Sequence, residues 1–156
     1  MANGLFKISV RFKAGASPQA FLAAHHLEPN GLVQKTIDKS VVDWCLPYTP
    51  WETGTMAKSA YTGTVFGSGK VRYLGPYARY LYYGKVFGPN IPVFEDDTGE
   101  PTRFFSPPGQ PKHPTGKDLK YSTDVNPLAG PFWFERMKAD HANDILEEAK
   151  RVAGLQ

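Results

Sequence analysis

A proline-rich segment, residues 87–131, constrains the fold of this chain more than any other stretch of its sequence. The segment contains nine of the 14 prolines: Pro89, Pro92, Pro101, Pro107, Pro108, Pro111, Pro114, Pro127 and Pro131. Because proline fixes φ and lacks a backbone N–H, it interrupts helices and central strands. We therefore predict a long arm here, with short strands only near residues 93–94 and 103–105.

An arm of this length must be held in place by other parts of the structure. Connections in compact domains have a median length of about 4–6 residues, and residues 87–131 are far longer. We expect the arm to pack on its own domain or on a neighbouring subunit, and we favour the neighbouring subunit.

Two helical patterns flank the arm. In the first, residues 32–46, the apolar positions recur every four residues: Val33, Ile37, Val41 and Cys45. Its expected outward-facing residues are Lys35, Asp38, Lys39 and Asp43. The second pattern, residues 131–153, has the apolar row Trp133, Met137, His141, Ile145 and Ala149. This spacing predicts an amphipathic helix, which we expect to cover a sheet.

The remaining elements are short. Residues 5–13 alternate between apolar and basic side chains, which predicts a half-buried strand. Ser17 and Pro18 start a short helix over 19–27, and Thr53 caps a short turn through 55–58. Residues 60–66 and 70–74 are predicted to form a hairpin around the Gly67–Gly69 turn. Pro76 and Gly84 delimit a helix over 77–83.

Together these patterns predict one α+β domain over residues 1–156. Its small, curved antiparallel sheet is expected to be packed by the central helix (32–46) and the C-terminal amphipathic helix. Residues 87–131 form the extended arm of this domain.

Charge is unevenly distributed along the chain. Residues 1–86 contain ten Lys or Arg and four Asp or Glu, whereas 87–131 contain four and six. No acidic residue lies between Glu52 and Glu95. This basic region suits DNA or an acidic protein surface, or it is simply a solvated face. Our candidate interface residues are Lys70, Arg72, Arg79, Lys85, Phe94, Phe104 and Phe105.

The sequence offers no catalytic, cofactor-binding or metal-binding pattern. The stretch Gly67–Lys70 lacks the spacing of a phosphate loop, because Thr64 and Val71 occupy two required positions. The four histidines lack zinc-site spacing, and the acidic residues 95–100 are better explained as a solvated turn than as a calcium loop. A single cysteine, Cys45, excludes an intramolecular disulfide and fits a reducing cytoplasm. We expect neither a signal peptide nor a membrane-spanning segment.

Three motifs in order resemble a family of tailed-phage minor capsid, or neck, proteins. The first motif covers Asp43–Pro50 and Glu52–Ser59, where a proline and an aromatic residue precede Glu-Thr-Gly. The second is Val71–Gly84, which contains Pro-Tyr-Ala-Arg, aromatic residues and glycine. The third is Gly130–His141, the opening of the last helix. The segment before residue 40 and the length of the arm are not part of the family pattern.

The resemblance implies a virion structural protein without catalysis, assembled in the host bacterial cytoplasm. Such a subunit forms a homo-oligomeric ring, six-fold or twelve-fold, at the head–tail junction. Its implied neighbours are the head-side connector and the tail-side terminator or tube proteins, and DNA passes through the lumen without sequence-specific contact. The implied role is head–tail joining or tail completion, and the tail-terminator ring is the alternative within the same neck.

Two other classes of function remain open from the residues. The basic, tyrosine-rich tract 58–85 suits a module that stacks single-stranded bases, although we expect half or more of its tyrosines to be packed within the domain. An enzyme would need a pocket with perturbed titratable groups, and the sequence offers only isolated candidates such as His141 and Glu135.

Overall fold

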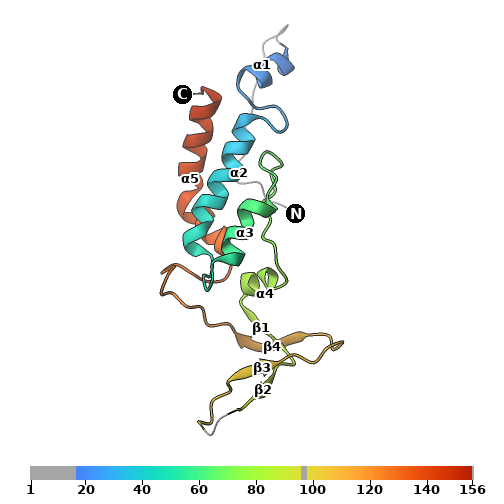
Figure 1. The fold of residues 1–156 in the computed structure, drawn as a ribbon. Helices are drawn as coiled ribbons and strands as arrows, with labels where there is room; N and C mark the ends of the chain where they lie inside the picture. Colours follow the sequence, from blue (N-terminus) through green and yellow to red (C-terminus); the bar gives the residue numbers. More distant parts are fainter. Residues whose placement is uncertain (1–16, 96–97, 156) are drawn as a thin grey trace.

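The computed structural model describes residues 17–95 and 98–155, so the expected strand over 5–13 lies outside the described residues. The described part contains five α-helices, one short 3-10 helix and two antiparallel sheets of two strands each (Figure 1). The helices are α1 (Pro18–Ala24), α2 (Leu32–Cys45), η1 (Leu46–Tyr48), α3 (Thr55–Gly63), α4 (Ala78–Tyr83) and α5 (Trp133–Ala153). The strands are β1 (Lys85–Gly88), β2 (Ile91–Val93), β3 (Arg103–Phe105) and β4 (His113–Asp118).

The core lies between α2 and α5, which run side by side (Figure 1). One buried cluster consists of Val41, Cys45, Tyr48, Trp133, Met137 and Ile145. A second cluster, toward the C-terminus of α5, consists of Val33, Ala149 and Ala153. These are the apolar rows expected from the four-residue spacing, since residues three and four apart share one helix face. The predicted apolar faces of both helices are therefore confirmed.

The α+β class with small antiparallel sheets and a C-terminal helix is confirmed, but the packing partner of that helix differs from our expectation. We expected α5 to cover a sheet, and in the described residues it packs against α2. An apolar stripe at helical spacing specifies that a face is buried without specifying what buries it. Helix–helix packing satisfies the stripes of α2 and α5 at once.

The hairpin predicted over 60–66 and 70–74 is wrong. Residues 60–63 extend α3, and residues 70–74 run as an extended segment beside that helix. Two backbone N–H groups that a strand ladder would use are taken by side-chain hydroxyls. Arg72 N–H donates to Thr64 Oγ1 at 3.0 Å, and Leu74 N–H donates to Ser59 Oγ at 2.8 Å. These contacts fix the segment to α3 without a second strand.

The Gly67–Gly69 turn is present, and it is anchored to α2 by Asp38. The Asp38 carboxylate is only 3% exposed, although we expected this residue on the outer face of α2. Its Oδ2 accepts hydrogen bonds from Gly67 N–H at 2.7 Å and Gly69 N–H at 3.1 Å. Its Oδ1 accepts one from the Gln34 side chain at 2.7 Å. The backbone donors that a phosphate loop would offer to a ligand are thus used by an internal carboxylate.

Helix α4 ends as predicted at Gly84, which adopts a left-handed conformation with φ 68°. The chain then enters β1 and leaves the helical body. It returns through residues 119–132, which are bonded to the body at several points. Tyr121 Oη donates to Leu81 O at 2.5 Å, and Asn126 Nδ2 donates to the carbonyls of Leu46 and Thr49 at 2.9 and 2.8 Å. This part of the proline-rich segment therefore packs on its own domain.

The rest of the arm projects beyond the helices as two two-stranded antiparallel sheets, of which β2–β3 is a hairpin (Figure 1). Strands β1 and β4 form one sheet, and β2 and β3 form the other. The short strands expected near 93–94 and 103–105 correspond to the end of β2 and to β3, whereas β1 and β4 were not predicted. Every residue of β3 and β4 is exposed. The two sheets consequently contribute no buried core to the domain.

Candidate interaction groove

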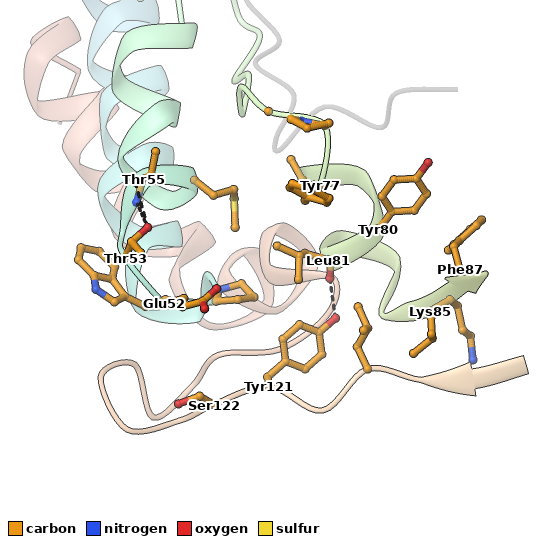
Figure 2. Close-up of a pocket in the computed structure, with 18 of the residues that line it drawn as sticks. Glu52, Thr53, Thr55, Tyr77, Tyr80, Leu81, Lys85, Phe87, Tyr121 and Ser122 are labelled. Carbon is orange, nitrogen blue, oxygen red and sulfur yellow. Dashed lines mark hydrogen bonds between the residues drawn. The ribbon is translucent and has the colours of Figure 1, made fainter. Parts of the chain in front are cut away.

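An open groove lies where the arm joins the helical body (Figure 2). Three segments line it: the turn and first residues of α3 (50–56), the α4 region with β1 (74–87), and the returning chain (119–122). Asn90, Phe104, Ser106 and Lys112 complete the lining. Its cavity volume of about 1170 Å³ exceeds the roughly 300–1,000 Å³ of ordinary small-molecule pockets. An open site of this size suits a polypeptide segment.

The first wall of the groove is a turn shaped by Gly54. Gly54 has φ 76°, and a Cβ placed on it would lie 2.4 Å from the Trp51 ring. Glycine therefore allows both the left-handed turn and the close approach of the indole. The Lys58 ammonium lies 5.4 Å from the centre of that ring, a cation–π distance. Thr53 Oγ1 accepts a hydrogen bond of 3.4 Å from Thr55 N–H, just before α3 begins (Figure 2).

The second wall is formed by α4 and carries aromatic side chains. Tyr77 is 70% exposed, while Tyr80 packs against Phe87 with ring centres 4.6 Å apart. Leu81 lies above Tyr121, whose hydroxyl bonds to the Leu81 carbonyl (Figure 2). The groove thus places exposed apolar surface next to positions fixed by hydrogen bonds.

Charge in the groove is positive. Lys85, Lys112 and Lys120 line it, and Glu52 is the acidic residue in the lining. Lys85 pairs with Asp118 across the β1–β4 sheet, and Lys112 donates to Asn90 Oδ1 at 2.7 Å. Lys120 is exposed and has no ion-pair partner in residues 17–95 and 98–155. The groove therefore favours an acidic, partly apolar partner.

Two titratable side chains of the core region, Cys45 and Tyr82, are held in their neutral forms. Burial raises the pKa of the Cys45 thiol to about 12, despite an opposing hydrogen bond from Tyr73. Burial, reinforced by Glu135, also raises the pKa of Tyr82. A thiol that stays protonated is a poor nucleophile. Within the described residues, no three His, Cys, Asp or Glu side chains gather closely enough to hold a metal ion.

The seven predicted interface residues do not form one site. Lys85 and Phe104 line the groove, whereas Lys70, Arg72 and Arg79 are exposed on the turn, the extended segment and α4. Phe94 and Phe105 are 54% and 48% exposed on the β2–β3 hairpin. The structure therefore separates the prediction into a groove, a basic surface and an apolar hairpin.

Sequence reasoning missed Lys112, Lys120 and the 50–56 turn as members of one site. We treated residues 87–131 as a single segment with more acids than bases. Residues 87–105 contain four acids, at 95, 96, 97 and 100, and one base, Arg103. Residues 106–131 contain three lysines, at 112, 117 and 120, and two acids, Asp118 and Asp124. A charge count in shorter windows would have separated an acidic first part of the arm from a slightly basic second part.

Half of the tyrosines of the 58–85 tract are used for packing, as expected. Tyr82 and Tyr73 contact the Trp133 ring with centres 4.7 and 5.3 Å away. Tyr80 packs on Phe87, which leaves Tyr77 as the most exposed ring of the tract. Tyr83 and Tyr61 are also exposed, by 51% and 37%, so half of the six tyrosines of the tract are packed and half reach the surface.

His141 is also a structural residue. Its ring stacks on Trp44 with centres 3.9 Å apart, and its Nδ1 lies 2.9 Å from Asp144 Oδ2. The interpretation of a semi-buried, hydrogen-bonded histidine is confirmed.

None of the helices in the described residues is long and apolar enough to cross a membrane. Comparison of the chain with models of protein families, with curated proteins and with solved structures gives no significant match, so no family is assigned to it.

Proposed function

We propose that this chain is a structural protein of a tailed-phage virion that forms a homo-oligomeric ring at the head–tail junction. Its role is to join head and tail or to complete the tail. The tail-terminator position in the same neck is the alternative. In this role the chain binds copies of itself and neighbouring rings, and it catalyses no reaction.

The observation that carries the proposal is the exposed arm. Two-stranded hairpins are marginally stable alone in water and normally need a third strand or a packed face. The arm has two such two-stranded sheets, and the residues of β3 and β4 are all exposed. The β2–β3 hairpin carries four apolar side chains that are 48–64% exposed: Ile91, Phe94, Phe104 and Phe105. These apolar surfaces are explained if another subunit covers them.

The three resemblance motifs are consistent with this role for a second reason. Residues 50–56 and 74–81 line opposite walls of the groove, and Trp133, in the third motif, packs under α4 through Tyr82. The motifs therefore specify one binding surface and the packing that supports it. Exposed Lys70, Arg72 and Arg79 provide positive charge suited to acidic neighbours or to passing DNA.

The test is the composition of purified virions and the effect of losing the gene. We expect this chain in purified tailed particles, in a copy number that is a multiple of six. Deletion of its gene should leave filled heads and separate tails in electron micrographs, and expression of the chain in trans should restore joined particles. Complete, infectious particles that lack the chain would contradict the proposal.

A further inference from the structure

We propose that the groove receives the β2–β3 hairpin of a second copy of this chain. The inference rests on the ring proposed above and specifies the two surfaces that meet in it. It assigns the groove walls, residues 50–56 and 74–87, to one copy and residues 91–105 to the next.

The β2–β3 hairpin is a locally formed element with exposed apolar side chains. Its backbone register pairs Ile91 with Phe105 and Val93 with Arg103, so the two strands satisfy only each other. Thr102 extends the pairing through hydrogen bonds to Val93 O at 3.0 and 3.1 Å. The hairpin is thus formed locally, and its apolar side chains remain in water. A preformed element of this kind loses little conformational entropy when it docks.

The hairpin and the groove carry opposite net charges. Residues 89–105 contain four acids, Glu95, Asp96, Asp97 and Glu100, and one base, Arg103. The groove contains three lysines and one glutamate, and Lys85 is already paired with Asp118, so Lys112 and Lys120 are the lysines without an ion-pair partner in the described residues. Arg103 is already paired with Glu95 at 2.8 Å, so the remaining acidic charge of the hairpin is not balanced by that residue. Opposite potentials on two surfaces of the same chain favour head-to-tail association of copies.

The hairpin and the groove are two different surfaces of the same subunit. Figure 1 places strands β2 and β3 at the end of the arm away from the helices, while the groove lies where the arm joins the body. Phe104 lines the groove of its own chain, whereas Phe94 and Glu100 lie outside that lining and are exposed. The outer part of the hairpin, which carries these two residues, is therefore the part assigned to the groove of the next copy. A pair of different surfaces on one subunit gives a heterologous interface, which closes into a ring when the rotation allows.

The decisive experiment mixes two variants that each lack one surface. The hairpin variant is Phe94→Ser with Glu100→Gln, and the groove variant is Tyr77→Ser with Lys120→Gln. All four side chains are exposed, so both variants should fold. Wild-type protein should be oligomeric by native mass spectrometry at micromolar concentration. Each variant alone should associate at least about tenfold more weakly, because apolar anchors and charges at an interface centre contribute most of the affinity.

An equimolar mixture should give a one-to-one heterodimer and nothing larger. The groove variant supplies an intact hairpin, the hairpin variant supplies an intact groove, and the other two surfaces are both impaired. A matched control, Lys35→Gln with Glu147→Gln, changes the same charges on exposed faces of α2 and α5 and should assemble like wild type.

Three results would overturn the inference. They are a wild-type chain that stays monomeric, variants that assemble like wild type, and a mixture that gives no heterodimer. A wild-type oligomer whose mixed variants fail to pair rejects this interface while leaving the ring proposal intact. Absence of the chain from purified virions, with heterodimers formed as expected, rejects the virion role and leaves the interface intact.

Discussion

The buried carboxylate of Asp38 joins α2 to the turn that follows α3. It accepts two backbone N–H groups and one side-chain amide. A buried donor that loses its partner also lacks water to replace it. Removing Asp38 should therefore lower the free energy of unfolding more than removing a surface acid. Its position also explains how two backbone N–H groups of the Gly67–Gly69 turn find a hydrogen-bond acceptor within the protein.

Replacing Asp38 tests this anchor. We expect Asp38→Ala to lower the free energy of unfolding by about 3 kcal/mol, because two backbone donors lose a charged acceptor. Asp38→Asn retains one acceptor oxygen and should lose about half as much. Urea denaturation measures both changes, and Glu147→Gln, at an exposed position of α5, serves as the control. Equal stability of Asp38→Ala and wild type would contradict the role of the carboxylate as an anchor.

Tyr48 gives a prediction for alkaline pH. Its hydroxyl donates to Asp140 Oδ2 at 2.6 Å, and this bond raises the pKa of Tyr48 from 10.0 to about 12. The protonated form is favoured in the folded state, so its contribution is complete below about pH 10 and is lost as pH rises through about 12. We expect the free energy of unfolding to fall across this window.

Tyr48→Phe isolates the contribution of this hydroxyl. Other groups, including the buried Cys45 and the partly exposed Tyr61, also have raised pKa values and add to the decline in wild type. The variant should therefore show a slope that is shallower by about 1.4 kcal/mol per pH unit in this window, the value for one proton. Urea midpoints measured at several pH values give both slopes. Parallel curves for wild type and variant would show that Tyr48 titrates equally in both states.

Helices α2 and α5 carry the core, and their packing was partly readable from the sequence. The four-residue spacing of Val33, Val41 and Cys45 identified the buried face of α2. The same spacing could not show that α5 would pack there, because an apolar stripe is equally suited to a sheet. The hairpin prediction failed for a related reason. The hydroxyls of Ser59 and Thr64 accept the hydrogen bonds of backbone N–H groups that a second strand would otherwise use. Local β propensity does not take such side-chain acceptors into account.

Met137 tests the α2–α5 interface. Its side chain is fully buried in the main core cluster. We expect Met137→Ala to lower the free energy of unfolding by about 3 kcal/mol through lost burial and a residual cavity. Leu32→Ala, at a position 52% exposed on α2, should change it by less than about 0.5 kcal/mol. Thermal or urea unfolding compares them, and similar losses in both variants would place the core elsewhere.

The molecule consists of a helical body that contains the buried core and an arm whose strands β3 and β4 are exposed. Gly88 and His113 are paired across β1 and β4, so the chain between them can be removed and the ends rejoined by a tight turn. We expect a variant with residues 89–112 replaced by Asn-Gly, a favoured two-residue hairpin turn, to fold with stability within about 1 kcal/mol of wild type. Circular dichroism and urea unfolding monitor the body.

The same variant should lose assembly, since it lacks the apolar hairpin. Native mass spectrometry should find it monomeric at concentrations where the full chain is oligomeric. A control in which the hairpin is retained and Lys35→Gln is introduced should keep the wild-type mass. Assembly of the shortened chain at the wild-type level would contradict any role of the hairpin between subunits.

The sequence by itself determined helices α1, α2, α4 and α5, the apolar faces of α2 and α5, and the existence of the arm. These properties follow from spacing and from the backbone limits of proline, which act over a few residues. Only the tertiary structure decided that α5 packs on α2, that Asp38 turns inward, and that residues 50–56, 74–87 and 119–122 line one groove. Each of these depends on which groups far apart in the chain satisfy one another's apolar surface and hydrogen bonds, and no local pattern records that choice.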